Sequence, residues 1–317
     1  MLKYRAISFP ILIALLAVMV FWPEWGKYLF SIAAGLMAGM MFYETGTMLE
    51  KVGIRSFRKS AAILGGFFLT VMLLGLTFQP DSFYSLITGE NQLKSDSFYS
   101  LMNGDNRLKN VQVLFQILTA CSLLVIMFGG WVMLLFRKEK REVMERSLGS
   151  VGILALCGIP VTALALVYFE PGLGPVALFF VMMVTKAMDT GGYIFGMLSN
   201  RWMPGGNHKI VPSISPKKSW EGTAGGVILS IAVSLLFYWL FCSKGIGVNA
   251  PLGWYIAAAV VLALGSFAGD LTESALKRTC DVKDSGHWIP GMGGAFDVLD
   301  SFIYNGILFW LLVFFLR

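Results

Sequence analysis

Apolar residues form long, nearly uncharged runs that are separated by polar segments along the whole chain. These runs cover approximately residues 6–22, 28–43, 61–79, 111–136, 148–169, 173–188, 223–243, 251–269 and 302–316. Several approach the ~20 residues that a helix needs to cross a bilayer, and two of them, 28–43 and 302–316, are shorter. Because barrel strands would give alternating segments of about 10 residues, continuous runs favour helices. The pattern predicts an all-α, polytopic integral membrane bundle of about nine transmembrane helices.

The distribution of lysine and arginine predicts how these spans are oriented. If the N-terminus is cytoplasmic, most of the 25 lysine and arginine residues fall in segments on the cytoplasmic side. Positive residues accumulate on that side of membrane proteins, which favours a cytoplasmic N-terminus and an external C-terminus. The opening MLKYR and the run after it lack a small-residue cleavage site, so we expect the run to be a retained first span.

Composition agrees with this class and excludes others. The chain has 317 residues, of which 56% are hydrophobic and 14% charged, and its mean hydropathy is +0.69. Soluble globular proteins carry about 25% charged residues. The net charge of +6 is what cytoplasmic loops facing anionic lipid would supply, so we expect a bilayer partner and no nucleic acid. The four cysteines form no C-x-x-C pair, which predicts core residues rather than a metal or disulfide framework.

One segment is duplicated. DSFYSLITGENQLK at 81–94 is followed by DSFYSLMNGDNRLK at 96–109, and two copies are too few for a solenoid. We expect an external loop at 81–109 within an N-terminal transmembrane region, 1–136, with a lid or partner site as the alternative reading. The remainder, 137–317, is expected to be the catalytic transmembrane region.

That C-terminal region contains three polar segments. RKEKREVMER at 137–146 has mixed charges and predicts a solvated surface helix. The segment 189–222 is rich in glycine, proline and basic residues, and predicts a cytoplasmic, anion-binding loop. The segment 270–300 is also expected on the cytoplasmic side, and it is unusually acidic. Its carboxylates are Asp270, Glu273, Asp281, Asp284, Asp297 and Asp300.

The spacing of these acids suggests a metal site. If the preceding helix continues past residue 270, then Asp270, Glu273 and Lys277 share one face. Burying the charges of this segment unpaired would cost on the order of 20–30 kcal/mol, so they must meet water or a metal. Asp297 and Asp300 are again three residues apart, after a glycine-rich turn. Two such carboxylate pairs could converge on Mg²⁺, although helix caps and surface ion pairs are the alternative for any single acid.

The segment SPKKSWEG supplies the complementary charge. Lys217 and Lys218 follow Pro216 and precede a span. A lysine pair at a membrane edge is commonly a topology feature, but lysine is also a compact charge suited to phosphate. Lysines, carboxylates and glycine turns on one face together suggest a Mg-nucleotide that reacts with a molecule in the bilayer.

The motifs DTGGY, SPKKSWEG and GDLTESALKRTCDVKDSGHWIPGMGGAFDVLDS resemble the phosphatidate cytidylyltransferase family. That family's C-terminal signature has Ser, Lys-Arg, Lys-Asp, PGHGG and DR before a last Asp. Met292 stands where the family has histidine, and Val298 stands where it has arginine. The matching residues are Ser274, Lys277, Arg278, Lys283, Asp284, Pro290, Gly291, Gly293, Gly294, Asp297 and Asp300.

The resemblance implies that CTP and phosphatidate react to give CDP-diacylglycerol and pyrophosphate at a cytoplasm-facing site, in a bacterial inner membrane. It implies Mg²⁺ on Asp270 and Asp297, supported by Glu273 and Asp300, with Lys277 and Lys217 also catalytic. Substrate binding is expected at Lys218, Ser219, Arg278, Asp189, Lys283, Asp284, Gly293 and Gly294.

Several alternatives stay open at this point. A CTP-dependent kinase of a membrane lipid alcohol would need the same lysines, carboxylates and metal. Met292 and Val298 leave open a paralogue with an altered lipid substrate or lost activity. A transporter would carry polar residues at mid-membrane, whereas here almost every charge lies between the runs. A homodimer is one assembly that the sequence leaves open.

Overall fold

The computed structural model describes residues 11, 14–77, 140–169 and 173–316. The duplicated segment 81–109, the expected span at 111–136 and the expected boundary between regions at 136 lie outside the described residues. Within them the chain is helical and forms no β-strand, only isolated bridges. The expected helical class is therefore confirmed for the described residues.

Apart from α7, whose first half is charged, the long helices follow the apolar runs. They are α2 (Pro23–Lys51), α3 (Arg58–Thr77), α7 (Lys140–Ile153), α8 (Ile159–Phe169), α9 (Gly174–Trp202), α10 (Trp220–Leu240), α11 (Leu252–Thr279) and α13 (Asn305–Leu316). Shorter elements are the π-helix η1 (Leu154–Gly158), the 3-10 helices η2 (Cys242–Lys244) and η3 (Asp300–Phe302), and α12 (Ala295–Leu299).

Five helical segments of the described chain are long and apolar enough to cross a membrane. They are Arg141–Phe169, Gly174–Trp202, Trp220–Lys244, Leu252–Thr279 and Ala295–Leu316. The protein is thus an integral membrane protein.

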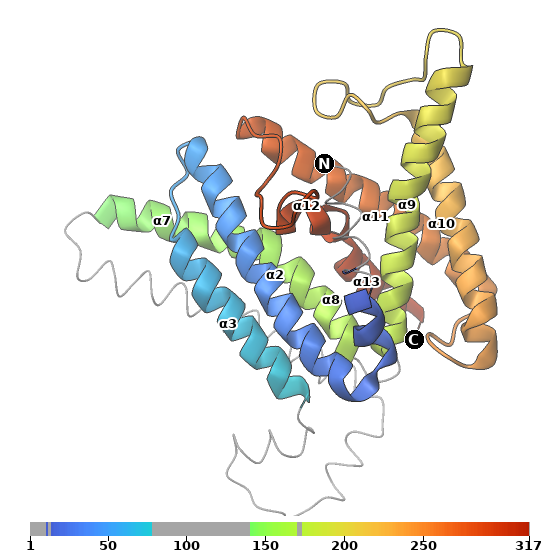
Figure 1. Ribbon diagram of the computed structural model, residues 1–317, viewed down its shortest axis with the longest axis horizontal. Coiled ribbons are helices and arrows are strands. Elements are labelled where there is room, and N and C mark those ends of the chain that lie inside the picture. Colours follow the sequence, from blue (N-terminus) through green and yellow to red (C-terminus); the bar gives the residue numbers. More distant parts are fainter. Residues whose placement is uncertain (1–10, 12–13, 78–139, 170–172, 317) are drawn as a thin grey trace, which may run out of the picture.

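Two helix pairs flank the centre of the molecule. Figure 1 shows α2 and α3 packed together on one side and α9 and α10 on the other, with α8, α11, α12 and α13 between them. One hydrophobic core surrounds Phe180, Tyr255 and Phe309. A second core joins Met41 of α2 to Phe296 of α12. The N-terminal helices therefore pack directly against the acidic C-terminal stretch.

The predicted loop at 189–222 is a loop only between α9 and α10. The prediction is wrong for residues 189–202, which continue α9, and for residues 220–222, which begin α10. The glycines in its helical parts serve helix packing, whereas Gly205 and Gly206 have positive φ in the turn after α9. A Cβ added to Gly191 would lie 2.8 Å from Gly226 Cα, and one on Gly222 would lie 2.8 Å from Gly192 O. The absence of side chains at these positions lets α9 and α10 approach closely, and α9 ends just before Pro204.

Two other expectations about helices are confirmed. Residues 270–279 continue α11, as the spacing of Asp270, Glu273 and Lys277 predicted. Residues 140–146 of the mixed-charge segment form the start of α7, where the exposed side chains of Arg141 and Glu145 pair at 3.0 Å, and residues 137–139 lie outside the described residues.

Candidate active site

Three carboxylates of the C-terminal stretch meet at one point. Asp270 and Glu273 come from α11 and Asp300 begins η3, and each offers an oxygen within 4.8 Å of the others. The close approach depends on Gly269, because a Cβ there would lie 2.4 Å from the carbonyl oxygen of Asp300. Glu273 is only 1% exposed. We call Asp270, Glu273 and Asp300 the acidic group.

The donor set of the acidic group fits a hard divalent cation. All of its ligand atoms are carboxylate oxygens, the type that Mg²⁺ prefers. Carboxyl groups also outnumber ammonium groups in and around the acidic group, and an excess of partly buried negative charge is unfavourable unless a cation compensates it. The surrounding carboxyl groups are Asp189, Asp270, Glu273, Asp297 and Asp300, and the ammonium groups are those of Lys186, Lys218 and Lys277.

Asp297, also expected at the metal, has a different environment. Its Oδ2 accepts hydrogen bonds from the backbone N–H groups of Gly294 at 2.8 Å and Ser285 at 2.9 Å, and Ser285 Oγ lies 3.0 Å from it. Its Oδ1 lies 2.8 Å from Lys277 Nζ, which also contacts Glu273 Oε1 at 2.6 Å. Asp297 thus connects the turn before α12 to the acidic group through Lys277.

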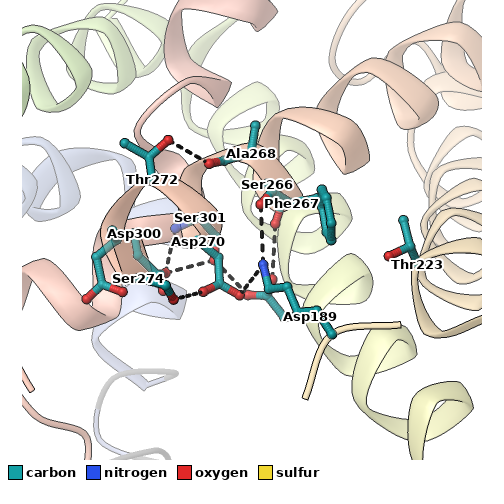
Figure 2. A network of polar contacts seen from close by, with 12 residues as sticks. Asp189, Thr223, Ser266, Phe267, Ala268, Asp270, Thr272, Ser274, Asp300 and Ser301 are labelled. Carbon is teal, nitrogen blue, oxygen red and sulfur yellow. Dashed lines mark hydrogen bonds and ion pairs between the residues drawn. The ribbon is translucent and has the colours of Figure 1, made fainter. Parts of the chain in front are cut away.

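Asp189 of α9 joins the same network from the other side (Figure 2). Its Oδ1 accepts a hydrogen bond from Ser266 of α11 at 3.0 Å, and its Oδ2 accepts one from Ser301 of η3 at 2.9 Å. Lys186, one turn earlier, pairs with it at 3.0 Å. Asp189 therefore holds α9, α11 and η3 together beside the acidic group.

A cavity of about 500 Å³ adjoins the acidic group between α9, α10, α11 and the loop that joins α9 to α10. Lys218 of this loop contacts Asp270 Oδ2 at 2.7 Å, so Asp270 belongs to both the cavity wall and the acidic group. The exposed Lys217 also lines the cavity. Other polar or charged lining residues are Asp189, Asn200, Lys209, Ser215, Ser219 and Thr223.

The loop bearing these lysines is fixed by its own hydrogen bonds. The amide of the buried Asn207 donates to Gly196 O at 2.7 Å and to Ser219 Oγ at 3.0 Å. Ser219, predicted to bind substrate, is the N-cap of α10 and accepts from Gly222 N at 3.1 Å. Figure 1 shows the loop at one end of the α9–α10 pair.

Of the remaining predicted residues, Arg278, Lys283 and Asp284 lie farther from the acidic group. Gly293 belongs to the turn before α12. Arg278 is exposed and donates to Ile214 O at 3.5 Å, which ties the loop to α11. Lys283 and Asp284 are exposed between α11 and α12. Gly293 has a φ of +100°, a value that favours glycine, and its place in the turn leaves room for Asp297.

Sequence reasoning missed Glu44 of α2, which is 2% exposed. Its carboxylate accepts hydrogen bonds from Ala295 N and Phe296 N at 3.0 Å and from Ser285 Oγ at 2.9 Å. Burial raises the pKa of the Glu44 carboxyl, while these hydrogen bonds act in the opposite direction. An acid at the end of the apolar run 28–43 is the signal that could have identified it.

Taken together, the features describe a helical membrane protein with a lysine-lined cavity next to a carboxylate cluster suited to a divalent cation. The sequence model of the cytidylyltransferase family matches residues 3–316, and the chain belongs to that family.

Curated relatives carry a more specific name. A phosphatidate cytidylyltransferase of Mycobacterium bovis is 38% identical over 148 residues, which are 47% of this chain and 44% of the relative. One of Staphylococcus saprophyticus is 40% identical over 125 residues, 39% of this chain and 44% of the relative. One of Haemophilus influenzae is 36% identical over 132 residues, 42% of this chain and 43% of the relative. The matched part thus spans less than half the length of each of these relatives.

Proposed function

We propose that the protein transfers the cytidylyl group of CTP to phosphatidate, which forms CDP-diacylglycerol and pyrophosphate for phospholipid synthesis. Membership of the cytidylyltransferase family and the names of the curated relatives support this reaction. The observation that carries the proposal is that Asp270 belongs both to the cavity wall and to the acidic group. It also pairs with Lys218, so a nucleotide phosphate and a divalent cation can meet there.

The residues fall into three proposed roles. Asp270, Glu273 and Asp300 would hold Mg²⁺, which when bound neutralises phosphate charge and fixes the phosphates in place. Lys217 and Lys218 contact the phosphates of CTP in the cavity, where Asp189 and Ser219 also lie. Asp297 acts on the site through Lys277, because it fixes the ammonium that contacts Glu273.

The proposed reaction needs no general base. An oxygen of the lipid phosphate, already an anion at pH 7, forms a bond to the α-phosphorus of CTP. The bond from that phosphorus to the oxygen bridging to the β-phosphate breaks, and pyrophosphate leaves with the electron pair. Positioning and charge neutralisation are therefore the main requirements. Lysines lining the cavity beside a carboxylate cluster meet them.

We further propose a bacterial inner membrane location, about nine spans in the whole chain, a cytoplasmic N-terminus and a cytoplasm-facing site. Most lysine and arginine residues fall in the segments that this arrangement places on the cytoplasmic side, which supports the orientation. The phosphatidate substrate would reach the site from the bilayer and CTP from the aqueous side.

The test uses the full chain in lipid nanodiscs that contain phosphatidate and the lipid alcohol diacylglycerol, with Mg²⁺ and CTP labelled at either the α- or the γ-phosphorus. We expect the α-label in a CDP-lipid and the γ-label in pyrophosphate, and loss of both products when EDTA removes the metal. Transfer of the γ-label to a lipid alcohol would instead establish the kinase alternative. Wild-type protein that forms no labelled lipid in either experiment would refute the proposal.

The matched variants are Asp270→Asn and Asp281→Asn. The first removes a carboxylate shared by the cavity and the acidic group, and we expect a loss of at least about 100-fold in product formation. Asp281 is an exposed acid just after α11, so its variant should keep near wild-type activity. Equal activities in the two variants would contradict the assigned site.

A further inference from the structure

Glu44 connects the N-terminal helices to the candidate active site. It lies on α2, more than 240 residues before each of its three hydrogen-bond donors, Ser285, Ala295 and Phe296. The two backbone donors are the first two residues of α12, whose N–H groups have no acceptor within that helix. A short helix that starts in a buried position needs such acceptors, and Glu44 provides them.

A continuous series of polar contacts leads from Glu44 to the acidic group. Ser285 Oγ is 2.9 Å from Glu44 Oε2 and 3.0 Å from Asp297 Oδ2. Lys277 Nζ is 2.8 Å from Asp297 Oδ1 and 2.6 Å from Glu273 Oε1. Glu44 therefore reaches Glu273 of the acidic group through three intervening side chains.

The packing around Glu44 leaves little freedom for the turn. A Cβ on Gly286 would lie 2.4 Å from Glu44 Oε1, and one on Gly294 would lie 2.2 Å from Glu44 Oε2. Both glycines precede α12, and Asp300 follows directly after it. The Glu44 carboxylate thus packs closely against the segment that leads into α12, the helix that Asp300 follows.

We propose that Glu44 is a positioning residue for the divalent cation, an inference that rests on the proposed function. By fixing the first turn of α12 and the Ser285–Asp297–Lys277 series, it holds Asp300 and Glu273 within reach of Asp270. Side chains that hydrogen-bond metal ligands directly typically contribute about 10- to 100-fold to metal affinity, and Glu44, which acts through three side chains, is expected at the lower end of that range. The N-terminal helix α2 is accordingly part of the catalytic structure.

The test measures binding of Mn²⁺ to the full chain in nanodiscs, by the loss of the free-ion signal in electron paramagnetic resonance. Glu44→Gln replaces one acceptor oxygen by an NH₂ group, a donor that would face the N–H or O–H donors of Ser285, Ala295 and Phe296. We expect Mn²⁺ binding to be about 10-fold weaker. The Mg²⁺ concentration for half-maximal activity should rise in parallel. The control is Thr45→Val, a change at the residue that follows Glu44 on α2. It removes the buried hydrogen bond between Thr45 and Cys157. This variant should bind Mn²⁺ as wild type does.

Two further variants make each result decisive. Wild-type Mn²⁺ affinity in Glu44→Gln, or equal weakening in Thr45→Val, would overturn the positioning role. If Glu44→Gln does not fold, Ser285→Ala takes its place, because it removes the second side chain of the series that leads from Glu44 to Glu273. Unchanged Mn²⁺ affinity in Ser285→Ala would also overturn the positioning role of Glu44. Asp300→Asn distinguishes the two proposals: unaltered Mn²⁺ binding there would refute the acidic group as the metal site, whatever Glu44 does.

Discussion

Lys218 Nζ lies 2.7 Å from Asp270 Oδ2. This ion pair joins the loop before α10 to the C-terminal half of α11, which we propose faces the cytoplasm. The ammonium is also 3.3 Å from Phe267 O and 4.5 Å from the centre of the Phe267 ring. The Lys218 side chain is only 15% exposed. Its charge is thus held at the boundary between the cavity and the acidic group, where developing charge on a nucleotide phosphate could be stabilised.

Replacing Lys218 should therefore affect the reaction more than the fold. Lys218→Met keeps much of the side-chain volume and removes the charge, and we expect kcat/KM for CTP to fall by about 10²- to 10³-fold. Steady-state kinetics in nanodiscs measure this effect. Lys244→Met is the matched control, because Lys244 is exposed in η2, beyond the other end of α10. A similar loss of kcat/KM in both variants would show that removing any lysine charge lowers activity, and that Lys218 has no specific role.

Asp297 should contribute strongly to stability. Its side chain is 8% exposed and that of its partner Lys277 is 14% exposed. Removing one member of a buried pair leaves the other charge poorly compensated, so we expect Asp297→Ala to lower the free energy of unfolding by about 3–5 kcal/mol. Denaturant titration of the solubilised protein measures it. Asp284→Ala removes an exposed acid of the same turn and should change stability by no more than about 0.5 kcal/mol. Comparable values for the two variants would refute the structural role.

The sequence predicted the class of fold because apolar runs and helix length are local properties. It also predicted that Asp270, Glu273 and Lys277 share a helix face, because 3.6-residue periodicity fixes which side chains are neighbours. The extent of α9 was not predictable from composition alone. Gly191 and Gly192 look like loop residues until the approach of α10 is known.

The sequence identified most residues of the candidate site, but not how they are arranged in space. Spacing placed Asp297 and Asp300 three residues apart, but Asp300 joins the acidic group while Asp297 accepts hydrogen bonds from Ser285 and Gly294. That division depends on how the turn before α12 packs against α2. Glu44 was missed for the same reason, because its three partners are more than 240 residues away and no local pattern connects them.

Gly294 should tolerate no side chain. An added Cβ would lie 2.2 Å from both Glu44 Oε2 and Ser285 Oγ, distances that require the buried carboxylate to move. We expect Gly294→Ala to lower both the thermal midpoint and the activity in nanodiscs. The control is Gly152→Ala in α7, where an added Cβ meets no atom within 4 Å. Replacing that exposed helical glycine should stabilise the protein by about 0.5–1 kcal/mol. A harmless Gly294→Ala would mean that the contact with Glu44 is not tight.

Met292 should be replaceable by histidine, the residue of the resembling family. Met292 belongs to a turn held by backbone hydrogen bonds, from Met292 N to Ile289 O at 3.1 Å and from Ile289 N to Gly293 O at 2.9 Å. Its half-buried side chain takes no part in either bond. Because the proposed reaction needs no proton carrier, we expect Met292→His to keep or raise the rate of CDP-lipid formation, with an unchanged thermal midpoint. Met292→Leu, which preserves the apolar character, is the matched control. A large loss of activity in the histidine variant, with full activity in the leucine variant, would show that this turn requires an apolar side chain at position 292.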